Sequence, residues 1–474
     1  MAGSAVRRPW PAAGLMRGCG LVRRRILAAA VATACLVGAP GPAAADQAEY
    51  TPAGLPVPSI ATSLPANGDP MGYRRLLAER GINYHFVYTN DILANMAGGQ
   101  RRGVINQGKL DMALQLDLQK LIGMQGLTFF ANVFVIHNTG RIRRDYVGGI
   151  NTIAAIEAVP TVRLSELWLE QKLGGDLASL RFGQLAADVE FFFSGLSTLL
   201  LQSDWATIAA TNMSSGGPAY PLSTPGARLK IDPTPNLSLL FAVFNGDPAG
   251  PGPGDEQARN RYGLNFRVQD PPLLMAEAQF RTNRAPGDTG LASTVKVGGW
   301  AHLGRFNDQR FANDGTLIAN PAGSRIPLAR RGNWGLYGVA EQQVYRPAGG
   351  DADSGISLFG RVSVSPSDRN LVSFYADGGV VFAGMIASRP DDKFGFGVIY
   401  SRFSDSVRAF ERDVAAFTGL PVVVRDYELN IEATYLAQIR PGLTVQPVLT
   451  YVIHPNGDRS RNAVVGGMRT MVRF

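Results

Sequence analysis

Hydrophobic and polar residues alternate along most of the chain from about residue 81 onward. In an extended strand, alternation places successive side chains on opposite faces. In residues 109–120, leucine and methionine side chains fall on one face, and Asp111 and Asp117 fall on the other. The segment 428–439 repeats this pattern. Counting such segments predicts about sixteen or seventeen strands, many of them about ten residues long.

The most regular pair of strands is predicted within residues 162–193, on either side of a turn at residues 174–176. The Gly-Gly-Asp sequence of this turn is typical of a tight β-hairpin. On the second strand, Leu180 and Phe182 alternate with polar residues. The hairpin therefore needs an apolar medium on one side and water on the other. Its polar face carries Glu166, Trp168, Glu170 and Arg181.

Residues 1–45 predict a cleaved export signal. Basic residues up to Arg25 precede an apolar run from Ile26 to Val37, and the three alanines before Asp46 fit a cleavage site. The apolar run has about 12 residues, whereas a membrane-spanning helix needs about 20. Both cysteines of the chain lie within the signal, so the mature chain is expected to have no disulfide and no Cys-bound metal.

Residues 46–80 are rich in proline and predict a periplasmic lead-in with a short helix at residues 71–80. A lid or plug is the alternative for this segment. Residues 81–474 are expected to form one β-barrel domain.

Composition argues against two classes of function. The signal contains six arginines and no acidic residue, so the remaining chain has 40 basic and 38 acidic residues, which gives no support to nucleic-acid binding. Its four histidines are scattered without metal-ligand spacing, and no cofactor is expected. Glu166 and Glu170 could in principle serve a glycosidase, but their place on one face of a strand favours a lumen role. An enzyme is therefore not predicted.

Two architectures fit the alternating strands. A soluble sandwich or propeller buries its apolar face against another sheet, whereas a transmembrane antiparallel β-barrel turns that face to lipid and lines a water-filled lumen with polar residues. The export signal, the missing cysteines and the strand lengths favour the barrel, in the bacterial outer membrane. In residues 463–474, Met468 and Phe474 are expected to face outward and Arg469 and Arg473 inward. A final aromatic residue is similar to the C-terminal signature of outer-membrane barrels.

Several stretches of the chain resemble the OprB-type carbohydrate-selective porins. They include GINYHFVYTND, RLSELWLEQ with LRFGQLAADVEFF, VGGWAHLGRF, and LTVQPVLTYVIHPNG with GGMRTMVRF. The resemblance implies a sixteen-strand barrel that admits monosaccharides and small saccharides by passive diffusion. The chain departs from the family within residues 311–331 and 409–424, which makes the substrate range the property least transferable from the family.

A pore that favours sugars needs polar side chains for hydroxyl groups and an aromatic ring for the C–H faces. The hairpin supplies both. The alternative is that these residues only line a water-filled barrel. The predicted substrate-binding, pore-lining residues are Trp168, Glu166, Glu170, Arg181, Asp111 and Asp117.

A barrel of this size needs loops to narrow it. Residues 141–160 and 188–225 are long enough, and the family resemblance implies that such loops fold inward. The alternative for the arginine cluster of the first loop is contact with lipid phosphates at the cell surface. The predicted constriction residues are Arg141, Arg143, Arg144, Glu157, Asp188 and Glu190.

The leading hypothesis is an outer-membrane porin that passes mono- and small oligosaccharides into the periplasm. The alternatives are a general diffusion porin without sugar preference and, from another class, an enzyme or adhesin built on a barrel. The expected partners are small saccharides, outer-membrane lipid, and the assembly machinery acting on the strand that ends at Phe474; a homotrimer is one option for its assembly.

Overall fold

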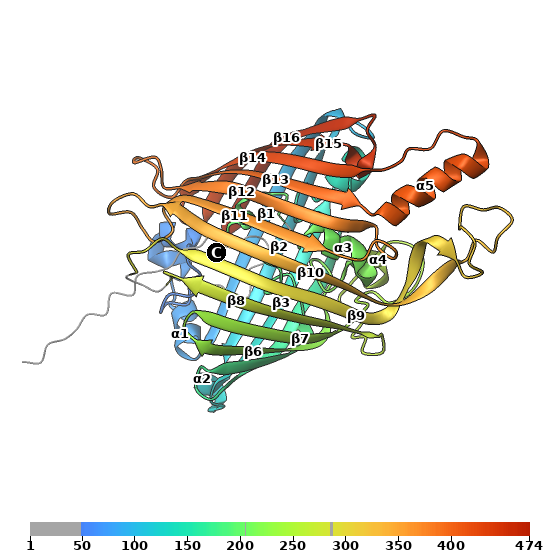
Figure 1. Ribbon diagram of the computed structural model, residues 1–474. Helices are drawn as coiled ribbons and strands as arrows, with labels where there is room; N and C mark the ends of the chain where they lie inside the picture. The colour runs from blue at the N-terminus through green and yellow to red at the C-terminus, as the bar shows by residue number, and fades with distance from the viewer. Residues whose placement is uncertain (1–48, 204, 285–287) are drawn as a thin grey trace, which may run out of the picture. The chain divides into compact units, whose positions relative to one another are not determined.

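Sixteen antiparallel strands form one closed barrel in the computed structural model, which describes residues 49–203, 205–284 and 288–474. The chain divides into two units, residues 1–35 and 36–474, and every described residue belongs to the second. The predicted signal, residues 1–45, lies outside the described residues. Each strand pairs with its neighbours in sequence, and the first strand pairs with the last (Figure 1). The strands are β1 (Ile82–Gly98), β2 (Gly103–Asp117), β3 (Leu127–Asn138), β4 (Thr161–Leu173), β5 (Ala178–Leu185), β6 (Thr224–Thr234), β7 (Leu237–Asn245), β8 (Pro272–Thr282), β9 (Ser293–Ala312), β10 (Pro327–Tyr345), β11 (Gly355–Val364), β12 (Val372–Ala383), β13 (Lys393–Phe403), β14 (Tyr427–Arg440), β15 (Leu443–Ile453) and β16 (Asn462–Arg473).

The two faces of the strands differ as the alternation predicts. On β16, Arg469 and Arg473 are buried toward the interior, whereas Met468 is exposed on the outside. The polar positions of β14 are also buried, among them Glu428 and Glu432. Closure of the sheet leaves the strands of the barrel without a free edge, which is the condition for a sheet to span a bilayer.

Connections at the two ends of the barrel differ in length. Turns of a few residues join β4 to β5, β6 to β7 and β14 to β15, at the end where β1 begins and β16 ends. Several connections at the other end are much longer, and bacterial barrels place such long connections on the extracellular side. The longest are residues 139–160, 186–223, 246–271 and 404–426.

Helices in the described part of the chain are short, and none there is long and apolar enough to cross a membrane. The α-helices are α1 (Tyr73–Glu79), α2 (Leu118–Ile122), α3 (Thr207–Asn212), α4 (Glu256–Arg259) and α5 (Asp405–Thr418). Single turns of other helix types are η2 (Ile60–Ser63), η3 (Pro65–Gly68), η4 (Ile142–Val147), η5 (Ser197–Leu199), η6 (Ser214–Gly216) and η7 (Pro455–Gly457).

The lead-in packs against the seam where β1 meets β16. Helix α1 falls within the segment predicted to be helical. The guanidinium of its Arg74 lies 4.2 Å from the Tyr84 ring centroid and 5.0 Å from that of Phe474. The backbone of Phe474 exchanges two hydrogen bonds with that of Phe86, each of 2.8 Å. The lead-in therefore covers the aromatic end of the chain.

Two predicted strands end earlier than their sequence pattern indicated. The second strand of the hairpin stops at Leu185, because Phe191 and Phe192 turn into the barrel, where both are buried, instead of facing lipid. The strand predicted over residues 109–120 stops at Asp117, whose carboxylate caps α2. In both places an apolar or alternating run continues past the point where the chain leaves the sheet.

Candidate functional site

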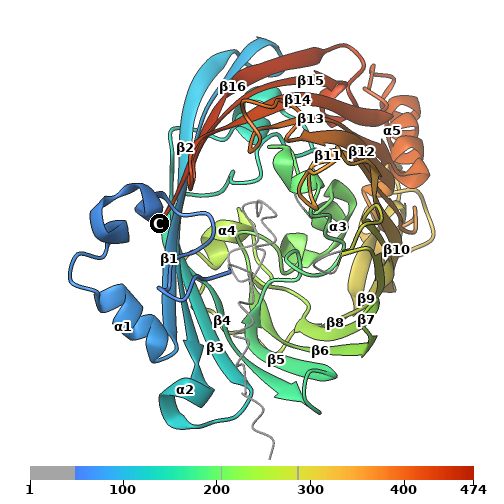
Figure 2. The same cartoon turned by 90° about the vertical axis from the view of Figure 1, so that its left-hand side faces the viewer.

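Two of the long connections lie inside the ring of strands. Figure 2 shows α3, which belongs to residues 186–223, within the barrel. We call residues 186–223 the inner segment. The shorter connection, residues 139–160, also reaches across to β14. The predicted inward folding of both loops is therefore present, and the lumen is narrower than the strand ring.

Two buried carboxylates of β14 hold these connections. Glu428 accepts hydrogen bonds from the backbone N–H groups of residues 150 and 151, both of 2.8 Å. Glu432 accepts from those of residues 201 and 202, at 2.7 and 2.9 Å. Buried backbone N–H groups outside regular structure need such acceptors. The inward-facing acids of β14 thus fix where the connections cross the lumen.

The wall formed by β8, β9 and β10 holds the inner segment at its aromatic run. Glu277 accepts a 2.7 Å hydrogen bond from the backbone N–H of Phe192, and Glu341 accepts one of 2.7 Å from the hydroxyl of Ser194. Lys296 donates to the carbonyl of the residue between them, also at 2.7 Å. Three consecutive residues of the segment are therefore bonded to three strands.

Phe192 adopts an uncommon backbone conformation, with φ of +56°. Its ring stacks on that of Tyr337 with centroids 4.3 Å apart, and the Tyr337 hydroxyl donates to Glu277 at 2.9 Å. A non-glycine residue keeps a positive φ only where its surroundings hold it there. The stacking and the hydrogen bond to Glu277 provide that support, so the following residue has a fixed position.

Two cavities lie on either side of Phe193. The outer cavity, of about 380 Å³, is lined by Arg143 and Glu157 from one long connection and by Gln257 from another. The inner cavity, of about 880 Å³, is lined by Asp176 of the short turn between β4 and β5. Phe193 lines both cavities. Its side chain therefore marks the boundary between them.

Four charged residues of the inner cavity form a charged cluster: Glu170, Arg181, Arg228 and Glu190. Arg181 contacts Glu170 at 2.8 Å, and Arg228 contacts Glu190 at 2.7 Å and Glu170 at 3.2 Å. Burial alone would raise the pKa of Glu190, but Arg181 and Arg228 hold that pKa below its usual value. The structure thus brings together three residues of the sequence prediction, Glu170, Arg181 and Glu190, and adds Arg228.

Trp168 does not lie in the lumen wall as a free aromatic surface. Its residue is only 4% exposed. Phe130 of β3 stacks on its ring with centroids 4.9 Å apart, and the Arg181 guanidinium of β5 lies 3.9 Å from the ring centroid. Because neighbours from both adjacent strands cover the indole, the predicted direct contact with a sugar face needs correction. Trp168 instead supports Arg181.

The other three predicted pore-lining residues lie apart from the cluster. Glu166 is buried and accepts a 3.1 Å hydrogen bond from the backbone N–H of Ala186, where the inner segment begins. Asp111 is buried beside Lys109, at 3.5 Å. The carboxylate of Asp117 accepts from two backbone N–H groups of α2, at 3.0 and 3.2 Å. Asp117 is thus a helix cap.

The arginines of residues 139–160 make contacts within the protein. Arg141 and Arg144 both bind Asp255 of the long connection 246–271, at 2.7 and 2.6 Å. Arg143 lies 3.6 Å from Glu157, and both line the outer cavity. Burial raises the pKa of Glu157 in spite of this arginine.

Asp188, the remaining predicted constriction residue, also lines the outer cavity. It accepts a 2.8 Å hydrogen bond from the backbone N–H of Tyr220, another residue of the inner segment. Asp188 therefore joins the two ends of that segment.

The anchors of the inner segment were not among the predicted site residues. Glu277 and Lys296 each occupy a buried position between outward-facing apolar residues of a strand, which is the signal that could have identified them. Across residues 49–203, 205–284 and 288–474, no three acidic or histidine side chains are grouped as metal ligands.

Comparisons with known proteins agree with this arrangement. The family model described as "Carbohydrate-selective porin, OprB family" matches residues 101–474. The chain is 26% identical to Porin B of Pseudomonas aeruginosa over 432 residues, which are 86% of this chain and 90% of that protein.

Solved structures show the same fold. The high-pH structure of Pseudomonas putida OprB aligns with a TM-score of 0.76 at 22% identity and covers 86% of this chain and 98% of that chain. The low-pH structure of the same protein aligns with a TM-score of 0.52 at 19% identity and covers 86% and 97%.

Proposed function

Because the chain belongs to the OprB family of carbohydrate-selective porins, we propose that its two cavities form a path for passive diffusion of mono- and small oligosaccharides. The family and the barrel fold imply the bacterial outer membrane as its location. The observation that carries the proposed path is the position of Phe193, which lines both cavities. A solute that moves from the outer to the inner cavity passes this residue.

The chemistry of the inner cavity suits a neutral, hydroxyl-rich solute. Arg181 and Arg228 offer N–H donors, and Glu170 and Glu190 offer acceptors, so sugar hydroxyls find both kinds of partner within one cluster. Phe193 replaces Trp168 in our proposal as the aromatic ring that meets the C–H faces of the sugar. An apolar solute of equal size would displace water from these charges without compensation.

Passage requires that each contact stays weak. The arginines and carboxylates of the cluster already bind one another, at 2.7 to 3.2 Å. A sugar therefore competes with existing ion pairs. Its net binding free energy is the free energy of its own hydrogen bonds minus that of the ion pairs it weakens. Such weak sites favour entry without holding the solute, as conduction demands.

Liposome swelling tests the proposal. Liposomes containing the purified barrel are compared in solutions of a hexose and of a neutral amino acid of equal size. We expect faster swelling with the hexose, and a reduced ratio of the two rates for Arg228→Gln. Equal rates for the wild type would identify a general diffusion porin and refute the sugar preference.

We also infer how the chain reaches the membrane. The predicted signal would be cleaved before Asp46, and the aromatic end of β16 would be recognised by the outer-membrane assembly machinery. Removal of Phe474 tests the second step. We expect a smaller fraction of folded barrel in the outer membrane, and an unchanged fraction would contradict it.

A further inference from the structure

Two arginines face each other on the outside of the barrel. Arg305 of β9 and Arg331 of β10 are direct partners in the antiparallel register, and both residues are exposed. Among the residues that the structure describes, neither guanidinium has a hydrogen-bond or ion-pair partner. Like charges directly opposite each other destabilise a strand pair. An anion between them would remove that repulsion.

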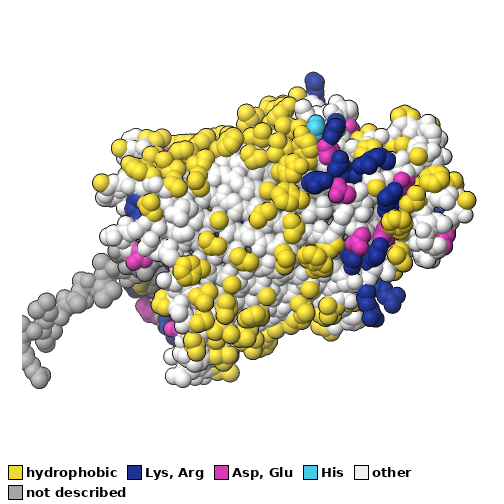
Figure 3. All heavy atoms as spheres, in the orientation of Figure 1, with side chains coloured by type: hydrophobic (Ala, Val, Ile, Leu, Met, Phe, Trp, Pro, Cys, Tyr) yellow, Lys and Arg dark blue, Asp and Glu magenta, His cyan; other side chains and the backbone are white. Residues whose placement is uncertain are grey.

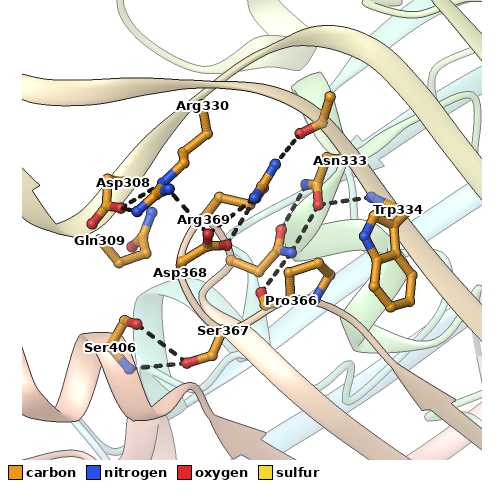
Figure 4. Close-up of polar contacts among 12 residues, drawn as sticks. Asp308, Gln309, Arg330, Asn333, Trp334, Pro366, Ser367, Asp368, Arg369 and Ser406 are labelled. Atoms are coloured by element: carbon orange, nitrogen blue, oxygen red, sulfur yellow. Dashed lines mark hydrogen bonds and ion pairs between the residues drawn. The ribbon is translucent and has the colours of Figure 1, made fainter.

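A β-bulge follows directly after Arg331. The register between β9 and β10 shifts between Arg331 and Asn333, and Gly332 between them has a φ of +71°. Arg369 donates to the carbonyls of Arg331 and Gly332, at 3.1 and 2.7 Å, and so holds the bulge. The preceding Arg330 instead turns to Asp308, at 2.7 Å (Figure 4). Arg330 and Arg331 precede the bulge as consecutive residues on opposite faces of β10, so Arg330 is paired with Asp308 and Arg331 faces outward alone.

The arginine pair lies at one edge of the apolar surface. Outward-facing Val295, Val297 and Leu303 of β9 are all exposed, and they span about 26 Å along the strand at about 3.3 Å per residue. A strand tilt of about 40° reduces this span to about 20 Å of membrane height, which fits within an apolar band about 25 Å tall. Arg305 follows Leu303 by two residues on the same face. On β10, the exposed Trp334 lies on the membrane side of Arg331, as Leu303 lies on the membrane side of Arg305 on β9.

The edge in question is the one with the long connections. The 313–326 connection follows β9 at this end, and Figure 3 shows that most of the Lys and Arg side chains in view gather toward the end that carries α5. Bacterial barrels place this end at the cell surface, with aromatic residues at the level of the lipid headgroups. The two guanidinium groups therefore stand where the outer leaflet has its phosphates.

We propose that Arg305 and Arg331 together bind a phosphate group of the outer-leaflet glycolipid, lipid A, whose acyl chains lie along β9 and β10. A guanidinium binds phosphate through two parallel N–H···O bonds, so two opposed arginines fit the oxygens of one phosphate. Leu303 and Trp334 supply the apolar contact for the attached chains. That contact selects a lipid phosphate over a free phosphate ion, which has no apolar part.

Binding of lipid A to the purified full-length barrel in detergent tests this site. The probes are diphosphorylated lipid A and the same lipid freed of its phosphates, with affinity measured by quenching of tryptophan fluorescence by lipid carrying brominated acyl chains and by native mass spectrometry. We expect the wild type to prefer the phosphorylated lipid, and Arg305→Gln/Arg331→Gln to lose about tenfold or more in affinity for it. The affinity of Arg305→Lys/Arg331→Lys should lie between those of the wild type and the glutamine variant. Lysine keeps the positive charge but lacks the two parallel N–H donors of the guanidinium.

Arg440→Gln is the matched control, since Arg440 is exposed at the opposite end of the barrel. Unchanged channel conductance and heat-induced gel mobility of each variant show that it has folded, and Arg331→Gln alone replaces the double variant if that one does not fold. Equal binding by wild type and variant, or equal binding of the dephosphorylated lipid, overturns the proposal. So does displacement of lipid A by millimolar inorganic phosphate, or occlusion of this face by a second copy of the chain.

Discussion

The guanidinium carbon of Arg181 lies 3.9 Å from the centroid of the Trp168 ring. Arg181 also contacts Glu170, so the cation is held between an aromatic face and a carboxylate. A cation–π contact at a desolvated site contributes about 1 to 2 kcal/mol. The indole therefore sets the position of an arginine that lines the inner cavity.

The first prediction concerns this support. Trp168→Ala should free Arg181 and weaken the block of ion current by sugar about three- to tenfold, with a smaller change in open-channel conductance. Trp168→Phe keeps a ring beneath the arginine and should retain most of the block. Single-channel recording with increasing sugar concentration measures both quantities. An unchanged block in Trp168→Ala would separate the tryptophan from the sugar path.

The second prediction concerns the attachment of the inner segment to β6. Glu190→Gln removes a carboxylate partner of Arg228, whose side chain is buried, and should lower the free energy of unfolding by about 3 kcal/mol. The loosened segment should also make the open current noisier. Unfolding in urea and single-channel recording measure these effects.

Asp176→Asn is the control for that variant. Asp176 also lines the inner cavity, but its side chain is 83% exposed and pairs with the exposed Lys172. Ion pairs in open water contribute little to stability. If both variants behaved alike, the inner segment would not depend on Glu190.

The third prediction is an absence of pH response in mild acid. The pKa of Glu190 is lower in the folded barrel than its usual value, because the effect of Arg181 and Arg228 outweighs that of the partial burial of its carboxylate. Its contribution to stability is therefore complete above the usual glutamate pKa and is lost as pH falls through the lower, folded-state pKa. Open-channel current should stay equally quiet at about pH 7 and about pH 5. Noise that rises between these two values would assign Glu190 a higher pKa.

The fourth prediction concerns Phe193. Phe193→Ala widens the boundary between the cavities, so single-channel conductance should rise and the ratio of hexose to amino acid swelling rates should approach one. Phe266→Ala is the control, because Phe266 is an exposed aromatic residue of a surface connection. Wild-type selectivity in Phe193→Ala would show that selection occurs elsewhere along the path.

The strand pattern of this protein could be predicted because each strand has two different solvents on its two faces. Residues 428–439 and 463–474 alternate with few exceptions, and their polar positions are buried in the lumen as expected. The same pattern predicted too long a strand at residues 118–120, where the alternation continues by chance into α2. Periodicity identifies a face, but it does not mark where the chain leaves the sheet.

The site could be predicted only in part. The polar face of the hairpin identified Glu170 and Arg181, but no local pattern indicates that Phe130 and Arg181 cover Trp168. The partners of Glu432 lie more than 200 residues earlier in the chain. Such contacts depend on how a long connection folds inside a closed barrel, and alternation says nothing about connections.

The bonds of the inner segment to β6 and β14 join opposite sides of the barrel. Because the segment links two opposite walls, it resists flattening of the barrel under lateral pressure from the surrounding bilayer. The cross-section open to solutes is then set by a few buried carboxylates inside the protein and is insulated from changes in lipid packing.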